Sequence, residues 1–172
     1  MCDTGWFVRS LRGKNRSYIG LRNTKDELSV KFKLITSSKP YKISEKIFFL
    51  GEIPRLTDFE SKTTSFVFED GTPDYVQDDS AVAFILPEGL FVITGCGHSG
   101  IVNTLEYSKR VTGVNNVFGI MGGYHLKEID LQLKKTIKYL KTNRIKHIYP
   151  SHCTELPALS SFYDSFGIKQ IN

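Results

Sequence analysis

The chain has 172 residues, which is enough for one domain with a hydrophobic core and excludes a small scaffold held together by disulfides. Hydrophobic residues make up 40% and charged residues 24%, and no stretch approaches the roughly 18 consecutive apolar residues that a membrane span requires. The net charge is +5, but the basic residues are spread along the chain, so the composition does not indicate a nucleic-acid-binding protein.

The amino-terminal segment and the cysteines bear on the compartment. Charged residues interrupt residues 1–22, so this segment lacks the apolar stretch of a signal peptide. The three cysteines, Cys2, Cys96 and Cys153, are odd in number and widely spaced, which does not suggest a disulfide framework. We therefore expect a cytoplasmic protein with no membrane partner.

Residues 1–86 are expected to consist mainly of strands and loops. Apolar and polar residues alternate from Leu28 to Leu34, which predicts a strand with one buried face. A second strand is predicted over residues 46–50, and the stretch 54–79 is rich in loop-forming residues.

Residues 87–172 repeat the order strand, tight loop and helix three times. The strands are predicted over 90–94, 117–121 and 146–149, and residues 81–86 form a hairpin with the first of them. The helix after the second strand has an apolar stripe made of Ile129, Leu133, Ile137 and Leu140. This order predicts an α/β (α+β) fold with partly parallel strands, in a single domain over 1–172.

Three of the four histidines occupy the same place in these three units. His98, His125 and His152 each lie just past the carboxyl end of a predicted strand, 27 residues apart in both intervals. Because parallel strands end at one edge of a sheet, we expect the three imidazoles to converge there. Imidazoles suit zinc, or iron and manganese where carboxylates join them, so the pattern favours a metal site over three ordinary loop residues. His147, at the opposite end of its strand, is interpreted as structural.

The glycines around His98 allow a competing interpretation. Gly95, Gly97 and Gly100 satisfy the G-x-G-x-x-G pattern between a strand and a helix, which is the setting of a nucleotide-binding turn. That fold also requires an acidic residue at the end of the next strand, and this chain has Met121 followed by two glycines there. A nucleotide-binding module is therefore a third alternative.

Five blocks of the sequence together resemble a known superfamily. In chain order they are GEIPR at 51–55, DDSA at 78–81, TGCGHSGIVN at 94–103, GGYHL at 122–126 and YPSHCT at 149–154. These blocks resemble the metallo-β-lactamase-fold superfamily, and more closely its branch named for dihydropterin ribofuranosylaminobenzene-phosphate synthase. The resemblance covers the chain from about residue 46 to residue 154.

The resemblance implies an αββα sandwich with a metal cleft along one edge. Such a cleft usually holds two zinc ions and hydrolyses an ester, an amide or a phosphoester. By motif, His98 and His152 would be metal ligands, and His125 matches the Gly-Gly-x-His-Leu block near a bridging ligand of other members. Asp78 and Asp79 are available carboxylates, although such a pair before a strand is more typical of a turn and cap.

One part of the superfamily's pattern is absent. The motif H-x-H-x-D-H, which supplies further metal ligands and the aspartate that positions water, does not occur in these 172 residues. The resemblance thus implies a partial domain, with the sandwich incomplete on its amino-terminal side. We expect a metal-dependent hydrolase-like protein for a phosphorylated or pterin-related small molecule, impaired as this chain alone. The alternative is a non-catalytic remnant or subunit that completes its fold with another chain or as a homo-oligomer.

Overall fold

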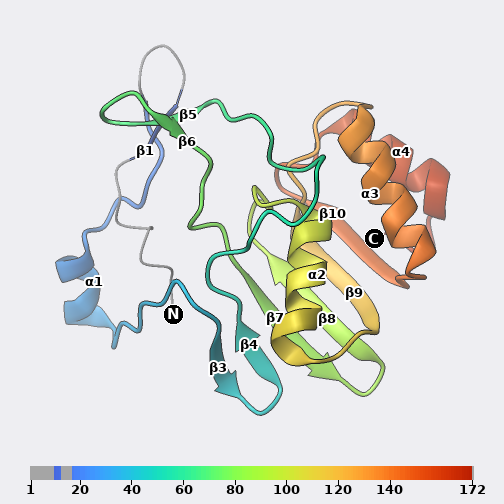
Figure 1. Ribbon diagram of the computed structural model, residues 1–172, viewed down its shortest axis with the longest axis horizontal. Coiled ribbons are helices and arrows are strands. Elements are labelled where there is room, and N and C mark those ends of the chain that lie inside the picture. The colour runs from blue at the N-terminus through green and yellow to red at the C-terminus, as the bar shows by residue number, and fades with distance from the viewer. Residues whose placement is uncertain (1–9, 13–16, 172) are drawn as a thin grey trace.

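Figure 1 shows the computed structural model of the chain, which describes residues 10–12 and 17–171. The strands form two sheets. The smaller sheet has the order β2-β1-β5-β6 and is antiparallel throughout. Its strands are β1 (Ser10–Arg12), β2 (Ser17–Tyr18), β5 (Phe66–Phe68) and β6 (Pro73–Asp74).

The larger sheet has six strands in the order β10-β9-β8-β7-β4-β3. Its strands are β3 (Tyr41–Ser44), β4 (Ile47–Phe49), β7 (Ala81–Leu86), β8 (Gly89–Thr94), β9 (Val117–Gly123) and β10 (His147–Ser151). Strands β8, β9 and β10 are parallel to one another, whereas β3, β4, β7 and β8 pair in antiparallel order. The predicted hairpin, the partly parallel sheet and the mixed helix and strand content are therefore confirmed.

Three helices cover one face of the larger sheet (Figure 1). They are α2 (Ile101–Thr112), α3 (Leu131–Thr142) and α4 (Leu156–Phe166). Their buried side chains pack on alternate residues of the strands, and the most central members of this core are Ala83, Val92, Leu105, Ile120, Leu133, Ile148 and Phe162. None of the helices in the described ranges is long and apolar enough to cross a membrane.

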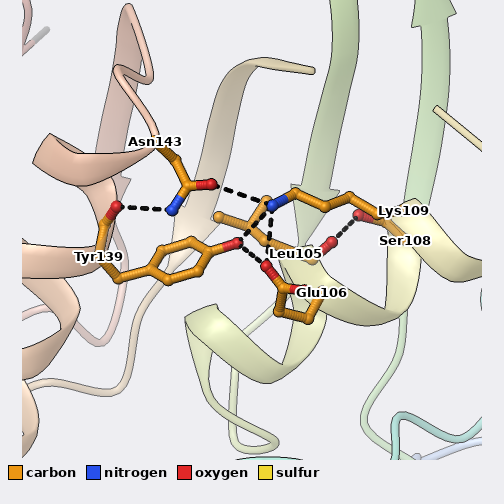
Figure 2. Close-up of polar contacts among 6 residues, drawn as sticks. All are labelled: Leu105, Glu106, Ser108, Lys109, Tyr139 and Asn143. Atoms are coloured by element: carbon orange, nitrogen blue, oxygen red, sulfur yellow. Dashed lines mark hydrogen bonds and ion pairs between the residues drawn. The ribbon is translucent and has the colours of Figure 1, made fainter. Parts of the chain in front are cut away.

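A polar network joins α2 to α3, as Figure 2 shows. The Lys109 ammonium donates hydrogen bonds to Glu106 Oε1 at 2.8 Å, Tyr139 Oη at 2.9 Å and Asn143 Oδ1 at 3.1 Å. The Tyr139 hydroxyl in turn donates to Glu106. The network fixes the two helices relative to each other toward their carboxyl ends.

The strand predicted from Leu28 to Leu34 is wrong, because this region holds the helix α1 (Lys25–Lys31). Thr24 and Glu27 form a reciprocal capping box: Thr24 Oγ1 accepts from the Glu27 amide at 3.2 Å, and Glu27 Oε2 accepts from the Thr24 amide at 2.8 Å. None of the α1 residues is buried, so the alternating apolar residues gain no stabilisation from packing on a sheet. Local capping therefore determines the structure here.

The apolar stripe predicted for the third helix is correct except at its first member. Ile129 lies before the start of α3 and is 60% exposed, because Asp130 caps the helix by accepting a hydrogen bond from the Leu133 amide at 2.8 Å. Leu133 and Leu140 are fully buried, and Ile137 packs against the core. The helix after β10 ends at Phe166, and Gly167 follows it with a positive φ of 73°.

Candidate functional site

The three histidines lie on neighbouring loops at one edge of the larger sheet. His98 follows β8, His125 follows β9 and His152 follows β10, and these three strands are parallel and adjacent. The predicted placement of each histidine just past a strand end is confirmed. The rings are nevertheless distributed over two neighbouring groups, which are described in turn.

His98 and His125 form the first group. Their ring centroids are 4.2 Å apart with the planes tilted by 50°, and Phe66 packs edge-on against His98 at 5.3 Å. The Nδ1 atom of His125 is buried and has no hydrogen-bond partner among the described residues. A buried nitrogen without a partner is costly, and a metal ion is the kind of ligand that would satisfy it. Two imidazoles in contact also suit zinc, whose bonds to nitrogen are about 2.0–2.1 Å long.

The surroundings of His98 keep its ring neutral. Burial is the main cause that lowers its pKa below 6.5, and the nearby His125 lowers the pKa further, while Asp79 opposes both. Neutral imidazole is the form that binds metal ions, so this pKa shift favours coordination near neutral pH.

Asp79 holds the loop of His98 rather than facing a ligand. Its Oδ2 accepts a hydrogen bond from the buried Ser99 amide at 2.8 Å, and the Asp79 residue is only 8% exposed. Gly97 adopts a positive φ of 68°, and a Cβ there would lie 2.5 Å from the Gly123 carbonyl oxygen. The aspartate thus acts as a cap, and Gly97 allows the two loops to approach closely.

Glu60 fills the amino-terminal end of α2. It is fully buried, and its carboxylate accepts hydrogen bonds from the Val102 amide at 2.9 Å and the Asn103 amide at 2.8 Å. Gly100 makes room for it, because a Cβ at Gly100 would lie 2.6 Å from Glu60 Oε2. These amides are the groups that would bind a phosphate in a nucleotide-binding turn, so the glycines serve packing around Glu60 instead. The geometry gives the nucleotide alternative no support.

His152 belongs to the second group, together with Cys96 and Cys153. One donor atom from each of the three residues lies within 4.8 Å of the other two. The His152 Nδ1 atom is 3.3 Å from Cys96 Sγ, and the Cys153 thiol donates a hydrogen bond to the Cys96 carbonyl oxygen at 3.0 Å. The two groups adjoin, since contacts with Cys96 first, and then with His125 and His152, lower the pKa of Cys153 against the effect of burial. The contact with Cys153, followed by burial, raises the pKa of Cys96.

A cavity of about 390 Å³ opens beside the first group. His98 and His125 line it together with Tyr75 and with two lysines, Lys62 and Lys127. The cavity offers space for a small molecule next to the imidazoles, and two carboxylates, Glu128 and Asp130, line it beside the two lysines.

Sequence reasoning missed two parts of this site. Sequence analysis treats Cys96 and Cys153 only as cysteines outside a disulfide framework, although their positions next to His98 and His152 in the sequence are a usable signal. Glu60 gave no local signal, because its partners Val102 and Asn103 are more than forty residues away. The assignment of His98, His125 and His152 as metal ligands stays a prediction.

Comparisons with known proteins agree with this architecture. No protein-family model matches the chain. The sequence is 34% identical over 139 residues to 7,8-dihydropterin-6-methyl-4-(beta-D-ribofuranosyl)-aminobenzene-5'-phosphate synthase of Methanocaldococcus jannaschii, covering 77% of this chain and 47% of the synthase. It is 35% identical over 147 residues to an uncharacterised protein of the same organism, covering 83% of this chain and 54% of that protein. The chain therefore spans about half the length of the curated relatives it matches.

The fold is also that of a solved structure. Tm1679, a metal-dependent hydrolase of the beta-lactamase superfamily, superposes with a TM-score of 0.80 at 24% identity, over 99% of this chain and 66% of that one. The chain thus has the fold of a metallo-β-lactamase superfamily hydrolase, and fold and sequence together support its resemblance to the branch named for dihydropterin ribofuranosylaminobenzene-phosphate synthase.

Proposed function

We propose that the chain is a metal-dependent hydrolase-like protein whose metal ion is held at the sheet edge by His98 and His125, with His152 as a third ligand. The observation that carries the proposal is the contact between His98 and His125, in which the buried Nδ1 atom of His125 has no hydrogen-bond partner among the described residues. Zinc is the ion that these imidazoles suit best.

The chemistry would be hydrolysis of a small anionic molecule in the adjoining cavity. A bound zinc ion supplies a Lewis acid and lowers the pKa of water to about 7. His98 and His125 would hold the ion, while Lys62 and Lys127 are the cavity residues that would pair with phosphate oxygens, beside Glu128 and Asp130. A phosphorylated or pterin-related ester is the substrate class we propose, supported by these lysines and by the phosphate named in the M. jannaschii synthase.

We also propose that this chain alone is a slow catalyst. Its 172 residues do not contain the H-x-H-x-D-H motif, so the aspartate that positions water in the superfamily has no counterpart of that kind here.

A cytoplasmic location, which the cysteine pattern predicts, fits the free thiols of Cys96 and Cys153.

Hydrolysis of nitrophenyl phosphate mono- and diesters by the purified chain, with and without added zinc, tests the proposal. We expect a slow, zinc-dependent rate that His98→Ala and His125→Ala abolish. His147→Ala is the matched control, because this histidine packs against Phe118 at the opposite end of β10 and should leave the rate unchanged. A rate that is the same in His98→Ala as in the wild type would contradict the proposal.

The uncovered face of the larger sheet favours a second role, as a subunit. Ile93 and Met121 lie opposite each other in neighbouring strands and are 38% and 39% exposed, with Phe84, Phe91 and Tyr149 half-buried on the same sheet. We propose that this face packs on the same face of a second copy. Each copy supplies one helical layer and one sheet layer, so two copies placed face to face complete an αββα sandwich.

The oligomeric state tests this second role. Sedimentation equilibrium of the wild-type chain should show a dimer, and Met121→Lys should shift it to monomer. An exposed substitution elsewhere, Glu45→Lys, should leave the dimer intact, since the Glu45 side chain is 90% exposed on a turn. A wild-type chain that stays monomeric at high concentration would contradict the proposal.

A further inference from the structure

The thiols of Cys96 and Cys153 and the imidazole of His152 form a compact group of soft donor atoms. All three donor atoms lie within 4.8 Å of one another, and Cys96 Sγ is 3.3 Å from His152 Nδ1. The cysteines are half-buried and His152 is exposed, so an ion in solution can reach the group. Both cysteines are free thiols.

The backbone holds the three residues in this arrangement. His152 adopts a left-handed conformation with φ of 51°, and the following turn is closed by the Thr154 amide and hydroxyl, which both donate to the Ser151 carbonyl oxygen at 3.0 Å. Gly123 lies beneath the thiols, since a Cβ there would be 2.6 Å from Cys153 Sγ and 3.0 Å from Cys96 Cα. A glycine at this position therefore lets the two loops bring their sulfur atoms together.

We propose that Cys96, Cys153 and His152 form a second metal site, selective for a thiophilic closed-shell ion such as Zn²⁺ or Cd²⁺. Bonds of about 2.3 Å to sulfur and 2.0–2.1 Å to nitrogen place tetrahedral ligands roughly 3.5–3.8 Å apart. The Cys96–His152 separation of 3.3 Å is close to that range, and the other donor atoms lie within 4.8 Å, so small side-chain rotations would close the site. Two sulfur donors favour soft ions over magnesium, calcium or manganese.

The site is distinct from the pair formed by His98 and His125. It shares only His152 with the proposed function. This ring presents its Nδ1 atom to Cys96, and its other nitrogen, Nε2, lies on a different side of the ring. Occupation by two thiolates and one imidazole leaves the fourth tetrahedral position to an outside ligand. Binding at this site therefore does not depend on whether His98 and His125 bind an ion.

Cadmium titration of the reduced chain tests the inference. It is followed by the ultraviolet charge-transfer absorption that only thiolate-bound cadmium produces. The wild type should saturate at one equivalent. Cys96→Ser and Cys153→Ser should each weaken cadmium binding at least about 100-fold, the upper end of the effect of losing an outer-shell partner. Cys2→Ser is the matched control and should titrate like the wild type.

Two further measurements separate the outcomes. The double variant His98→Ala/His125→Ala should keep the thiolate absorption. This result would show that the cysteine site binds cadmium even when the His98–His125 site has been removed. Should the cysteine variants misfold, alkylation of the wild type with iodoacetamide and peptide mapping should show that cadmium protects Cys96 and Cys153 but not Cys2. Absence of the thiolate absorption in the wild type, or equal alkylation with and without cadmium, would overturn the inference.

Discussion

Removing the buried carboxylate of Glu60 should destabilise the chain and loosen the loop of His98. The carboxylate accepts hydrogen bonds from the amides of Val102 and Asn103 and from the Thr57 hydroxyl at 3.2 Å. Glu60→Ala leaves the two buried amides without an acceptor, at about 1–3 kcal/mol each, so we expect a loss of about 2–6 kcal/mol in unfolding free energy. Glu60→Gln keeps one acceptor oxygen but places the NH2 group of its side-chain amide against a hydrogen-bond donor. It should lower the unfolding free energy by about 1–3 kcal/mol.

Urea denaturation followed by far-ultraviolet circular dichroism measures these changes. Glu45→Ala is the matched control: its side chain is 90% exposed, so its effect should stay within about 0.5 kcal/mol. A Glu60→Ala chain as stable as this control would refute the reasoning, because it would mean that the two amides find other partners or are not buried.

The pH dependence of the same comparison has a definite sign. Burial raises the pKa of Glu60 above 4.5, more than its hydrogen bonds lower it. The folded state therefore holds this proton more tightly than the unfolded state, and the stabilisation by Glu60 is complete below pH 4.5 and declines as pH rises through the raised pKa. The difference in stability between the wild type and Glu60→Gln should thus shrink as pH rises, and a growing difference would contradict the assignment.

Three other changes test further parts of the structure. Gly100→Ala, which places a Cβ 2.6 Å from Glu60 Oε2 at a φ of 97°, should lower the melting temperature far more than Gly113→Ala, whose Cβ meets nothing within 4 Å. Lys109→Met should cost about 1–3 kcal/mol in urea denaturation, because its ammonium links three acceptors between two helices. The lowered pKa of His98 makes the folded state resist protonation, so the unfolding free energy should rise with pH up to 6.5. With chelator present to remove metal ions, His98→Gln should make this rise less steep. An unchanged pH slope would assign that rise to other groups.

The repeated strand, loop and helix units were predictable because each carries its own periodicity, and two of the three helices end at a glycine, Gly113 and Gly167. The same regularity fixed where His98, His125 and His152 attach to the sheet. The strand predicted from Leu28 failed because alternation of apolar residues stabilises a strand only where a sheet can bury one face, and Thr24 caps a helix locally.

The grouping of side chains at the edge could not be predicted in the same way. Cys96 meets His152 across 56 residues of sequence, and this contact depends on the close approach of two loops over Gly123. Loop placement on that scale is set by tertiary packing, which leaves no periodic pattern in the sequence. Parallel strands predict a shared edge but not which rings touch.

The zinc content of the purified chain tests the central claim most directly. The protein is stripped with chelator, reloaded with zinc, dialysed and measured by mass spectrometry of the metal. The double variant His98→Ala/His125→Ala should hold one zinc ion fewer per chain than the wild type, while His147→Ala should match the wild type. Equal zinc content in the wild type and the double variant would contradict the account.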